Sequence, residues 1–313
     1  WPSGDKSPPF YPLTSLLFAK VLEEVGLPKG VLNVIQTEQP GEVTGPLIKD
    51  ARLRKLSFTG STGVGRRLIA DSADQVLRVS MELGGNAPII IFEDADMEKA
   101  LTGTMLAKLR NMGEACTAAN RILVHESIAE EFSTKLAAKM AALKVARGTE
   151  DGANIGPMID EKSRTNIHAL VEDAVSKGAT VLTGGAVPTG EGYFYPPTVM
   201  TNVSADARIM KNEVFGPVAP IITFKNEAEA IALANDTEFG LVAYAFTKDL
   251  NRGLRLAESL EVGMFGLNTG IVSNPAAPFG GVKASGLGRE GGKEGIEEYL
   301  ETVYIGIADP FED

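Results

Sequence analysis

Cys116 is the residue whose type and neighbours most directly suggest covalent chemistry. It is the single cysteine of the chain and lies in the stretch RNMGEACT at 110–117, where small residues would let a substrate carbonyl reach the sulfur. Glu82 opens the stretch ELGG at 82–85 and offers the base that a thiol needs for acyl chemistry. The alternative is that the cysteine only packs, because free cysteine is among the most buried residue types. The pair therefore predicts a thiol nucleophile that other features must support.

Metal and Ser-His-Asp chemistry have few candidate residues. His125, His168 and Cys116 are the nitrogen and sulfur ligands available, and their spacing is not that of a zinc site. His125 ends an apolar, strand-like run and His168 lies on a polar helical stretch, which does not favour a catalytic triad. We therefore expect no metal, and two histidines that are structural or face solvent.

The composition predicts a soluble protein of about two domains. The chain has 313 residues, of which 44% are hydrophobic, enough to form a sizeable core. Its net charge of −11, without a Lys/Arg-rich block, argues against nucleic acid or an anionic membrane as partner. One cysteine permits no intramolecular disulfide, and neither a signal-peptide core nor a membrane-spanning run is found. A cytoplasmic protein is expected.

Short apolar runs alternate with amphipathic segments, a pattern typical of parallel sheets flanked by helices. Residues 88–92 are apolar on both faces of a strand, which predicts a central, covered position. Further strands are predicted at 180–182 and 220–224, and loops at 184–197 and 274–292. Helices are predicted over 13–25, 66–73, 160–177 and 227–234, and after a capping box formed by Ser127 and Glu130. The fold class is therefore α/β.

A glycine-rich turn lies in the stretch KLSFTGSTGVG at 55–65, between a strand-like and a helix-like run. Backbone N–H groups at a helix N-terminus, approached closely through glycines, could hold a pyrophosphate. The order is G-x-x-G-x-G, which differs from the dinucleotide fingerprint G-x-G-x-x-G. An ordinary strand-to-helix turn is therefore an equal alternative on spacing alone.

Five ordered motifs resemble those of the aldehyde dehydrogenase superfamily. They are FTGST at 58–62, ELGG at 82–85, the cysteine loop at 110–117, NEVFGP at 212–217 and PFGG at 278–281. Two further stretches, 262–268 and 286–300, are most similar to the branch that oxidises succinate semialdehyde. The resemblance extends from about Pro12 to near the C-terminus.

The resemblance implies the roles of the reacting groups. Cys116 matches the nucleophile, whose thiolate attacks the aldehyde to give a thiohemiacetal and then a thioester. Glu82 matches the general base, which deprotonates Cys116 and later activates the water that hydrolyses the thioester. The implied reaction oxidises succinate semialdehyde, or a similar short aldehyde, to the carboxylate with NAD(P)+.

The resemblance also implies a nicotinamide cofactor. The matched positions are Gly60, Ser61 and Gly65 near the pyrophosphate, Glu213 on the nicotinamide ribose, and Phe215 near the ring. Leu83 is a further cofactor-binding position. Trp1 stands where the family has a ribose-binding lysine, unless counting back from Pro12 makes Lys6 its equivalent, which we prefer. On that count Pro9 occupies the position of the acid that would repel a 2′-phosphate. The cofactor is thus NADP or NAD.

For the substrate, the resemblance implies that Arg110 holds the distal carboxylate, a group that a planar guanidinium binds through two parallel hydrogen bonds. Its alternative is a surface arginine at a helix end. Ser273 matches a hydroxyl near the same carboxylate. Phe279 is either a wall of the substrate tunnel or an apolar anchor of its loop.

The implied organisation has three parts. Residues 1–84 would form a partial dinucleotide-binding domain of Rossmann type, 85–284 a catalytic domain with a parallel sheet, and 285–313 a return to the cofactor domain. A final strand near 301–307 would join the sheet of a neighbouring copy, which predicts a homo-oligomer, a dimer or tetramer.

Some family features have no match here. The N-terminal part that carries the first cofactor-domain strands and an oxyanion-binding asparagine is missing from the sequence, and so is a second substrate arginine. Removing an oxyanion donor costs ~10²–10³ in rate. Two alternatives to the dehydrogenase therefore remain, an inactive N-terminally truncated fragment and a cofactor-independent thiol esterase that uses Cys116 and Glu82.

Overall fold

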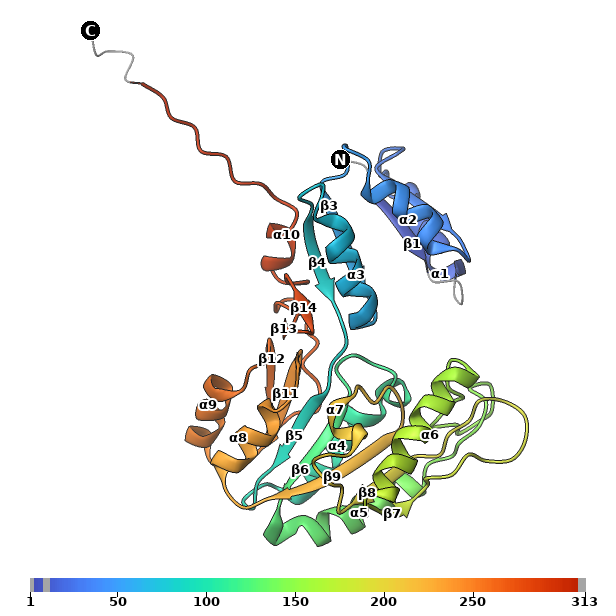
Figure 1. Cartoon of the computed structure of the whole chain (residues 1–313), viewed down its shortest axis with the longest axis vertical. Helices are drawn as coiled ribbons and strands as arrows, with labels where there is room; N and C mark the ends of the chain where they lie inside the picture. The colour runs from blue at the N-terminus through green and yellow to red at the C-terminus, as the bar shows by residue number, and fades with distance from the viewer. Residues whose placement is uncertain (1–2, 8–11, 309–313) are drawn as a thin grey trace. The chain divides into compact units, whose positions relative to one another are not determined.

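The computed structural model describes residues 3–7 and 12–308 (Figure 1). The chain divides into two compact units, each described by itself below. The first unit comprises Trp1–Leu56 and Arg67–Val79, and the second comprises Ser57–Arg66 and Ser80–Asp313. The division of the chain at residues 84 and 284 stays a prediction.

The first unit contains a small parallel sheet with two helices. Strand β1 (Ser3–Ser7) pairs in parallel with β2 (Leu32–Gln36). The helices are α1 (Pro12–Glu24) and α2 (Pro40–Ile48). Helix α1 corresponds to the predicted segment 13–25 and exposes several apolar side chains, among them Leu17 and Phe18.

The glycine-rich turn connects β3 (Lys55–Thr59) to α3 (Thr62–Ser72), and β4 (Arg78–Glu82) follows. Helix α3 begins at Thr62, ahead of the predicted start at residue 66. The N–H of Gly65 already donates to the Ser61 carbonyl at 3.0 Å, so the glycines form part of the first helical turn. The sheet order is β14-β4-β3, with β14 (Gly286–Leu287) antiparallel to β4.

A seven-stranded sheet dominates the second unit, in the order β12-β11-β5-β6-β9-β8-β7. Its neighbours are parallel except for the antiparallel pair β7 and β8. The strands are β5 (Ala87–Ile91), β6 (Ala119–His125), β7 (Thr180–Thr183), β8 (Thr198–Thr201), β9 (Val218–Phe224), β11 (Val242–Phe246) and β12 (Met264–Leu267). The prediction of an α/β fold with a parallel sheet is confirmed.

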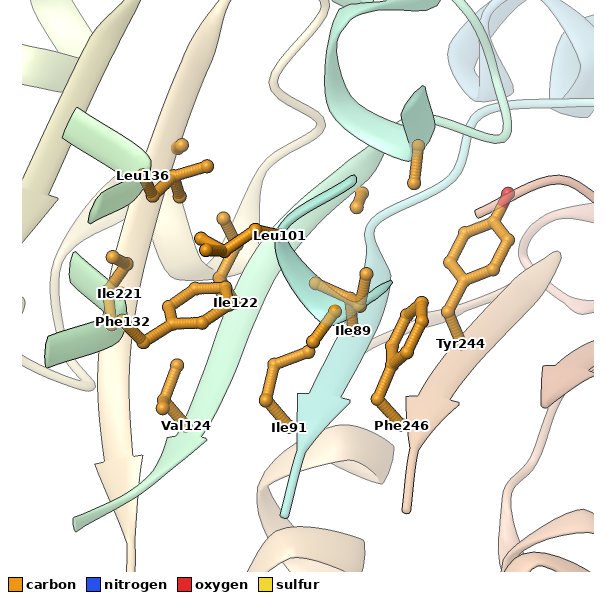
Figure 2. Close-up of a cluster of buried hydrophobic side chains, with 14 of the residues drawn as sticks. Ile89, Ile91, Leu101, Ile122, Val124, Phe132, Leu136, Ile221, Tyr244 and Phe246 are labelled. Carbon is orange, nitrogen blue, oxygen red and sulfur yellow. The ribbon is translucent and has the colours of Figure 1, made fainter. Parts of the chain in front are cut away.

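Helices cover both faces of this sheet. They are α4 (Met97–Leu109), α5 (Ala129–Ala141), α6 (Glu161–Ser176), α7 (Arg208–Lys211), α8 (Glu227–Asn235) and α9 (Leu250–Ser259). The short helix α10 (Glu294–Glu297) follows β14 in the chain. Ile89 and Ile91 of β5 face a cluster with side chains of α4 and α5 (Figure 2). Ile90 and Phe92 belong to the opposite cluster, which includes residues of α8 and α9. Every residue of β5 is buried, as its two-sided apolar pattern predicts.

The start of α5 differs from the predicted capping box. A short 3₁₀ turn, η2 (Glu126–Ile128), precedes the helix, so Ser127 lies inside that turn rather than at the helix N-cap. The Ser127 N–H donates to His125 Nδ1 at 3.3 Å. The His125 ring therefore accepts the Ser127 N–H, which in a capping box would donate to the Glu130 side chain.

The two predicted loops join the remaining short elements. The stretch 274–292 contains β13 (Val282–Lys283) and the β14 strand, and β13 pairs with β10 (Phe239–Gly240). Residues 301–308 carry no strand in this chain, and Tyr304 and Ile307 are exposed. The pairing of this segment with a neighbouring copy stays a prediction.

The described part of the chain contains neither a membrane-spanning helix nor a metal-binding group of side chains. Among its helices, none has the length and apolar character to cross a membrane. Within the same residues, no three His, Cys, Asp or Glu side chains are grouped so that they could hold a metal ion.

Candidate active site

The loop before Cys116 adopts an uncommon backbone conformation. After α4 the chain enters the turn η1 (Arg110–Gly113), in which Asn111, Met112 and Gly113 have φ values of 48°, 49° and 85°. Such left-handed conformations are unfavourable for a side chain like that of methionine and persist where the surroundings hold them. Met112 is buried in an apolar cluster, which anchors the loop.

Glycine brings the cysteine loop against the segment that follows Glu82. A Cβ atom on Gly85 would lie 2.4 Å from the Cys116 carbonyl oxygen, so only glycine fits without a shift. The Gly85 carbonyl also accepts a hydrogen bond from the Asn120 side chain at 3.2 Å. These contacts show why two motifs distant in sequence meet. Cys116 itself is half-buried against the edge of the main apolar cluster.

Glu82 is a buried carboxylate that lacks full hydrogen bonding. Its side chain is 5% exposed, and its Oε2 atom has no hydrogen-bond partner among the described residues. Burial raises the pKa of Glu82 to about 8, with Glu290 adding to the rise and Arg289 opposing it. A Cβ on Gly280 would lie 2.9 Å from Glu82 Oε1, so the PFGG motif closes over this carboxylate. A carboxyl group with a pKa near neutrality suits proton transfer.

Burial raises the pKa of the Cys116 thiol, and the negative charges of Glu82 and Glu213 raise it further. Arg110 opposes the rise. The thiol, the two carboxylates and the guanidinium thus share one electrostatic environment. Because Glu82 is the stronger acid of the two, proton transfer from Cys116 to Glu82 is unfavourable at equilibrium. Any reaction that uses the thiolate must therefore consume it as it forms.

Glu213 extends from the loop after α7 toward the same glycines. Its Oε1 accepts the Gly85 N–H at 3.0 Å, and a Cβ on Gly84 would lie 2.8 Å from its Oε2. Burial raises the pKa of Glu213, while the Gly85 N–H and Lys108 lower it. Two residues on, the Phe215 side chain is 40% exposed.

Lys108 is a buried cation that sequence reasoning missed. Its side chain is fully buried, and Nζ donates to Asn120 Oδ1 at 3.0 Å and to the Val214 carbonyl at 3.5 Å. Burial lowers its pKa to about 7, and Glu213 opposes the shift. The amine therefore connects the cysteine loop to the Glu213 loop. Its only sequence signal is a lysine among the apolar positions of α4.

The glycine-rich turn lies beside Glu82 through backbone contacts. The Gly60 N–H donates to the Glu82 carbonyl at 3.0 Å. A Cβ on Gly65 would lie 2.4 Å from Leu83 Cδ2, so this glycine permits close packing of α3 on the ELGG segment. Ser61 is exposed at the N-terminus of α3. Two of the residues predicted for the cofactor, Gly60 and Gly65, thus lie against the segment that carries Glu82.

Thr62 and Ser285 complete this arrangement and were not singled out by sequence reasoning. Thr62 Oγ1 accepts the Gly84 N–H at 3.3 Å and donates to the Ala284 carbonyl at 3.3 Å. Ser285 is fully buried, and its Oγ donates to the Gly84 carbonyl at 2.7 Å and accepts the Gly240 N–H at 2.9 Å. Both residues stood inside recognised stretches, but their hydroxyls gave no separate signal.

The residues predicted for the substrate are more dispersed. Arg110 is exposed, and its Nη2 donates to Thr117 Oγ1 at 2.9 Å. Ser273 is exposed, with no contact given to Arg110. Phe279 packs partly against the main apolar cluster and exchanges backbone hydrogen bonds of 2.7 Å with Glu290, which favours the role of loop anchor. Its role as a tunnel wall stays a prediction.

The predicted ribose-binding residue cannot be placed in the site. Lys6 lies in β1, opposite Ile35 of β2, but its side chain is outside the described part of the chain. Trp1 and Pro9, on which the alternative alignment and the 2′-phosphate prediction rest, also lie outside the described residues. These assignments stay predictions.

The fold and site together define an α/β protein with a thiol, a buried carboxylate and a glycine-rich helix start. Residues 6–305 match the model of the aldehyde dehydrogenase family, and the chain belongs to this family. The family resemblance inferred from five motifs is thereby confirmed.

Known proteins sharpen this assignment. Succinate-semialdehyde dehydrogenase of Paenarthrobacter nicotinovorans is 60% identical over 302 residues, which are 96% of this chain and 67% of that protein. Glutarate-semialdehyde dehydrogenase of Pseudomonas putida is 50% identical, over 95% of this chain and 61% of that protein. The NADP(+) succinate-semialdehyde dehydrogenase GabD of Escherichia coli is 48% identical, over 95% and 61%.

Solved structures agree with the fold. An aldehyde dehydrogenase of Brucella melitensis superposes with a TM-score of 0.94 at 50% identity, over 97% of this chain and 62% of that one. Betaine aldehyde dehydrogenase of Staphylococcus aureus, solved in complex with NAD+, gives a TM-score of 0.90 at 37% identity, over 95% and 60%. The chain thus spans about three fifths to two thirds of the length of these relatives.

Proposed function

We propose that this site oxidises a short aldehyde with a distal carboxylate, such as succinate semialdehyde, to the acid with NAD(P)+. The observation that carries the proposal is the pairing of the chain's single thiol with Glu82. Its pKa of about 8 and its unsatisfied buried Oε2 suit a base that gains and loses a proton near neutrality. The relatives named above supply the reaction class.

The chain's own groups account for the covalent steps. Cys116, deprotonated by Glu82, adds its sulfur to the aldehyde carbon, and the carbonyl becomes an alkoxide. Once that carbon is oxidised, the acyl group is a thioester on Cys116. Glu82 releases to solvent the proton it took from Cys116 and then removes a proton from water, whose oxygen attacks the thioester carbon. The C–S bond breaks, so that the acid leaves and Cys116 is again a thiolate.

The residues around Gly84 fit a nicotinamide nucleotide. A Cβ on Gly84 would lie 2.8 Å from Glu213 Oε2 and 3.2 Å from Thr62 Oγ1, so the absent side chain lets a carboxylate that can accept ribose hydroxyls approach this segment. Gly60 and Ser61 stand at the N-terminus of α3, a suitable position for a pyrophosphate. The nucleotide, when bound, would supply the two-electron oxidant. NAD and NADP are both proposed.

Arg110 gives the proposal its substrate class. A guanidinium whose charge acts on the Cys116 thiol can bind the far carboxylate of a short semialdehyde. The names of the P. nicotinovorans and P. putida relatives contain semialdehydes of this kind. We assign Ser273 to the same end of the substrate.

A homo-oligomer, a dimer or tetramer, is part of the proposal. Val303, Tyr304, Ile305 and Ile307 expose apolar side chains along a segment without a strand partner, which favours pairing with a second copy. Light scattering after gel filtration tests this assignment. A monomer across the micromolar range would contradict it.

Turnover measurements test the proposed reaction. The purified chain is mixed with succinate semialdehyde and NAD+ or NADP+, and reduced nicotinamide is followed by its absorbance. We expect formation of one acid per reduced nucleotide and loss of both products in Cys116→Ala. The absence of turnover with every short aldehyde, in a protein that is folded by circular dichroism, would contradict the proposal.

A matched assay separates the esterase alternative. An activated ester is offered without nucleotide, because Cys116 and Glu82 alone would suffice for its hydrolysis. Ester cleavage together with no aldehyde oxidation would favour the cofactor-independent esterase. Neither activity in a folded chain would favour the non-catalytic fragment.

A further inference from the structure

Thr117 follows Cys116 in the sequence, and both its side chain and its backbone accept hydrogen bonds from other side chains. Its side chain is 4% exposed, and its Oγ1 accepts the Arg110 Nη2 hydrogen bond of 2.9 Å. Its backbone carbonyl accepts a hydrogen bond from the hydroxyl of Tyr244 at 2.9 Å, and Tyr244 is 1% exposed on strand β11. The hydroxyl of Thr117 is therefore a fixed acceptor supported by the sheet.

Arg110 depends on this acceptor for its orientation. Among the described residues its side chain makes one hydrogen bond, the one to Thr117. An exposed arginine otherwise samples many rotamers, and holding one of its nitrogens leaves a planar fork with its other N–H groups directed to a ligand. Fixing the guanidinium beforehand lowers the entropy cost of binding.

We propose that Thr117 is a specificity-determining positioning residue, which holds Arg110 so that the Cys116 site prefers ligands with a distal carboxylate. The inference rests on the proposed function, because it concerns the same substrate end. It adds that selectivity depends on a hydroxyl that needs no contact with the substrate. Tyr244 supports the arrangement through the backbone of Thr117.

The charge of Arg110 acts on the reacting group as well as on a ligand. It opposes the rise in the pKa of Cys116. A guanidinium released from Thr117 would spend less time near both the sulfur and a bound carboxylate. Loss of the hydroxyl should therefore weaken the binding of anionic ligands more than that of neutral ones.

The single cysteine provides a readout that does not need turnover. Cys116 is alkylated with iodoacetamide in the intact chain, and the protection given by succinate is titrated, with neutral succinamide as the matched ligand. We compare the native chain with Thr117→Val, which removes the hydroxyl at constant shape, and Thr117→Ser, which keeps it. Arg110→Met defines the loss of the guanidinium itself.

We expect Thr117→Val to weaken succinate protection about 3- to 10-fold, the range for the net contribution of one typical hydrogen bond. Arg110→Met should weaken it about 10- to 100-fold. Thr117→Ser should protect like the native chain, and succinamide should show no difference. With turnover, Thr117→Val should raise KM for the semialdehyde more than KM for a neutral aldehyde.

The outcomes separate the two proposals. Native protection in Thr117→Val, together with weak protection in Arg110→Met, would overturn the role of Thr117 and leave the substrate class standing. Native protection in Arg110→Met would overturn both. A Thr117→Val chain whose thermal unfolding also changes, without rescue in Thr117→Ser, would show a structural role and overturn the inference.

Discussion

Two carboxylates, Glu82 before β5 and Asp94 after it, have contrasting surroundings. Ahead of the strand, Glu82 has a buried oxygen without a partner and a pKa raised to about 8. Just after the strand, Asp94 accepts hydrogen bonds of 2.8 to 3.1 Å from Thr247 Oγ1 and from the N–H groups of Lys248 and Asp249. Arg252 Nη1 donates a further bond of 2.9 Å to it.

The difference separates structural charge from reactive charge. Although partial burial opposes it, hydrogen bonds led by that of Thr247 lower the pKa of Asp94, so this carboxylate stays ionised and joins β5 to β11. Glu82 has no such donors, and its proton can move. Reactive groups lie at the amino ends of β5 and β6 here, whereas ligands of many open α/β sheets bind at the carboxyl ends.

The largest effect is expected at the reactive end. Glu82→Gln should lower aldehyde turnover ~10²–10⁴-fold, because an amide cannot act as the base. The native rate should rise with pH through about 8 as Glu82 loses its proton. A pH series of kcat for both proteins checks this expectation.

The same variant should affect thiol reactivity in the opposite direction. Above pH 8 the charge of Glu82 raises the pKa of Cys116, so Glu82→Gln should increase the rate of alkylation by iodoacetamide there. A variant that slowed both turnover and alkylation and also unfolded at a lower temperature would show that Glu82 supports the fold.

At the other end, Asp94→Asn should reduce the free energy of unfolding by about 2–4 kcal/mol, because it weakens several charge-assisted hydrogen bonds. The stability that Asp94 contributes is present above its ordinary pKa and is lost as pH falls through the lower pKa of the folded protein. Urea unfolding at neutral and acid pH measures it. A change in Cys116 alkylation at neutral pH in Asp94→Asn would contradict the conclusion that Asp94 is structural and Glu82 reactive.

Gly85→Ala tests the close approach that assembles the reactive end. Its Cβ would lie 2.4 Å from the Cys116 carbonyl, a backbone atom, so we expect a loss of about 1–3 kcal/mol from overpacking, together with altered alkylation of Cys116. Gly148→Ala is the control, because nothing lies within 4 Å of a Cβ there. Equal behaviour of the two variants in thermal unfolding and alkylation would contradict this packing.

The last expected effect concerns the pH dependence of stability at Lys108. Its pKa is about 7 in the folded chain and 10.5 by its ordinary value, so the unfolded chain binds more protons between these values and stability should rise with pH across that window. Lys108→Met should remove this rise. Urea unfolding at pH 7 and pH 10 measures the difference, and parallel pH profiles for both proteins would refute the assignment.

The sheet could be predicted from the sequence because its signal is local. An apolar run such as 88–92 indicates a strand buried on both faces, and the structure has β5 there. The start of α5 was wrong, because His125 takes the Ser127 N–H, a contact that a capping pattern does not include. Helix α3 begins earlier than predicted, because Gly63 and Gly65 form part of its first turn instead of preceding it.

The residues of the candidate site likewise differ in whether a local sequence signal marks them. Cys116 and Glu82 could be found because motifs mark them, and Lys108 and Ser285 could not, because their roles arise from burial and from contacts across long sequence separations. The hydrogen bond between Arg110 and Thr117 belongs to the second group. Residue type alone indicates that an arginine could hold a carboxylate, but not which neighbour holds the arginine.

The hydrogen bond from Gly60 to Glu82 has a consequence for anyone who redesigns this protein. If the nucleotide binds at this turn as proposed, changing residues 60–65 to accept another nucleotide should also displace the peptide that carries Glu82. Under the proposed function, coenzyme preference and reaction rate are then coupled through this hydrogen bond. An engineering route that alters ribose contacts elsewhere would leave the catalytic carboxylate undisturbed.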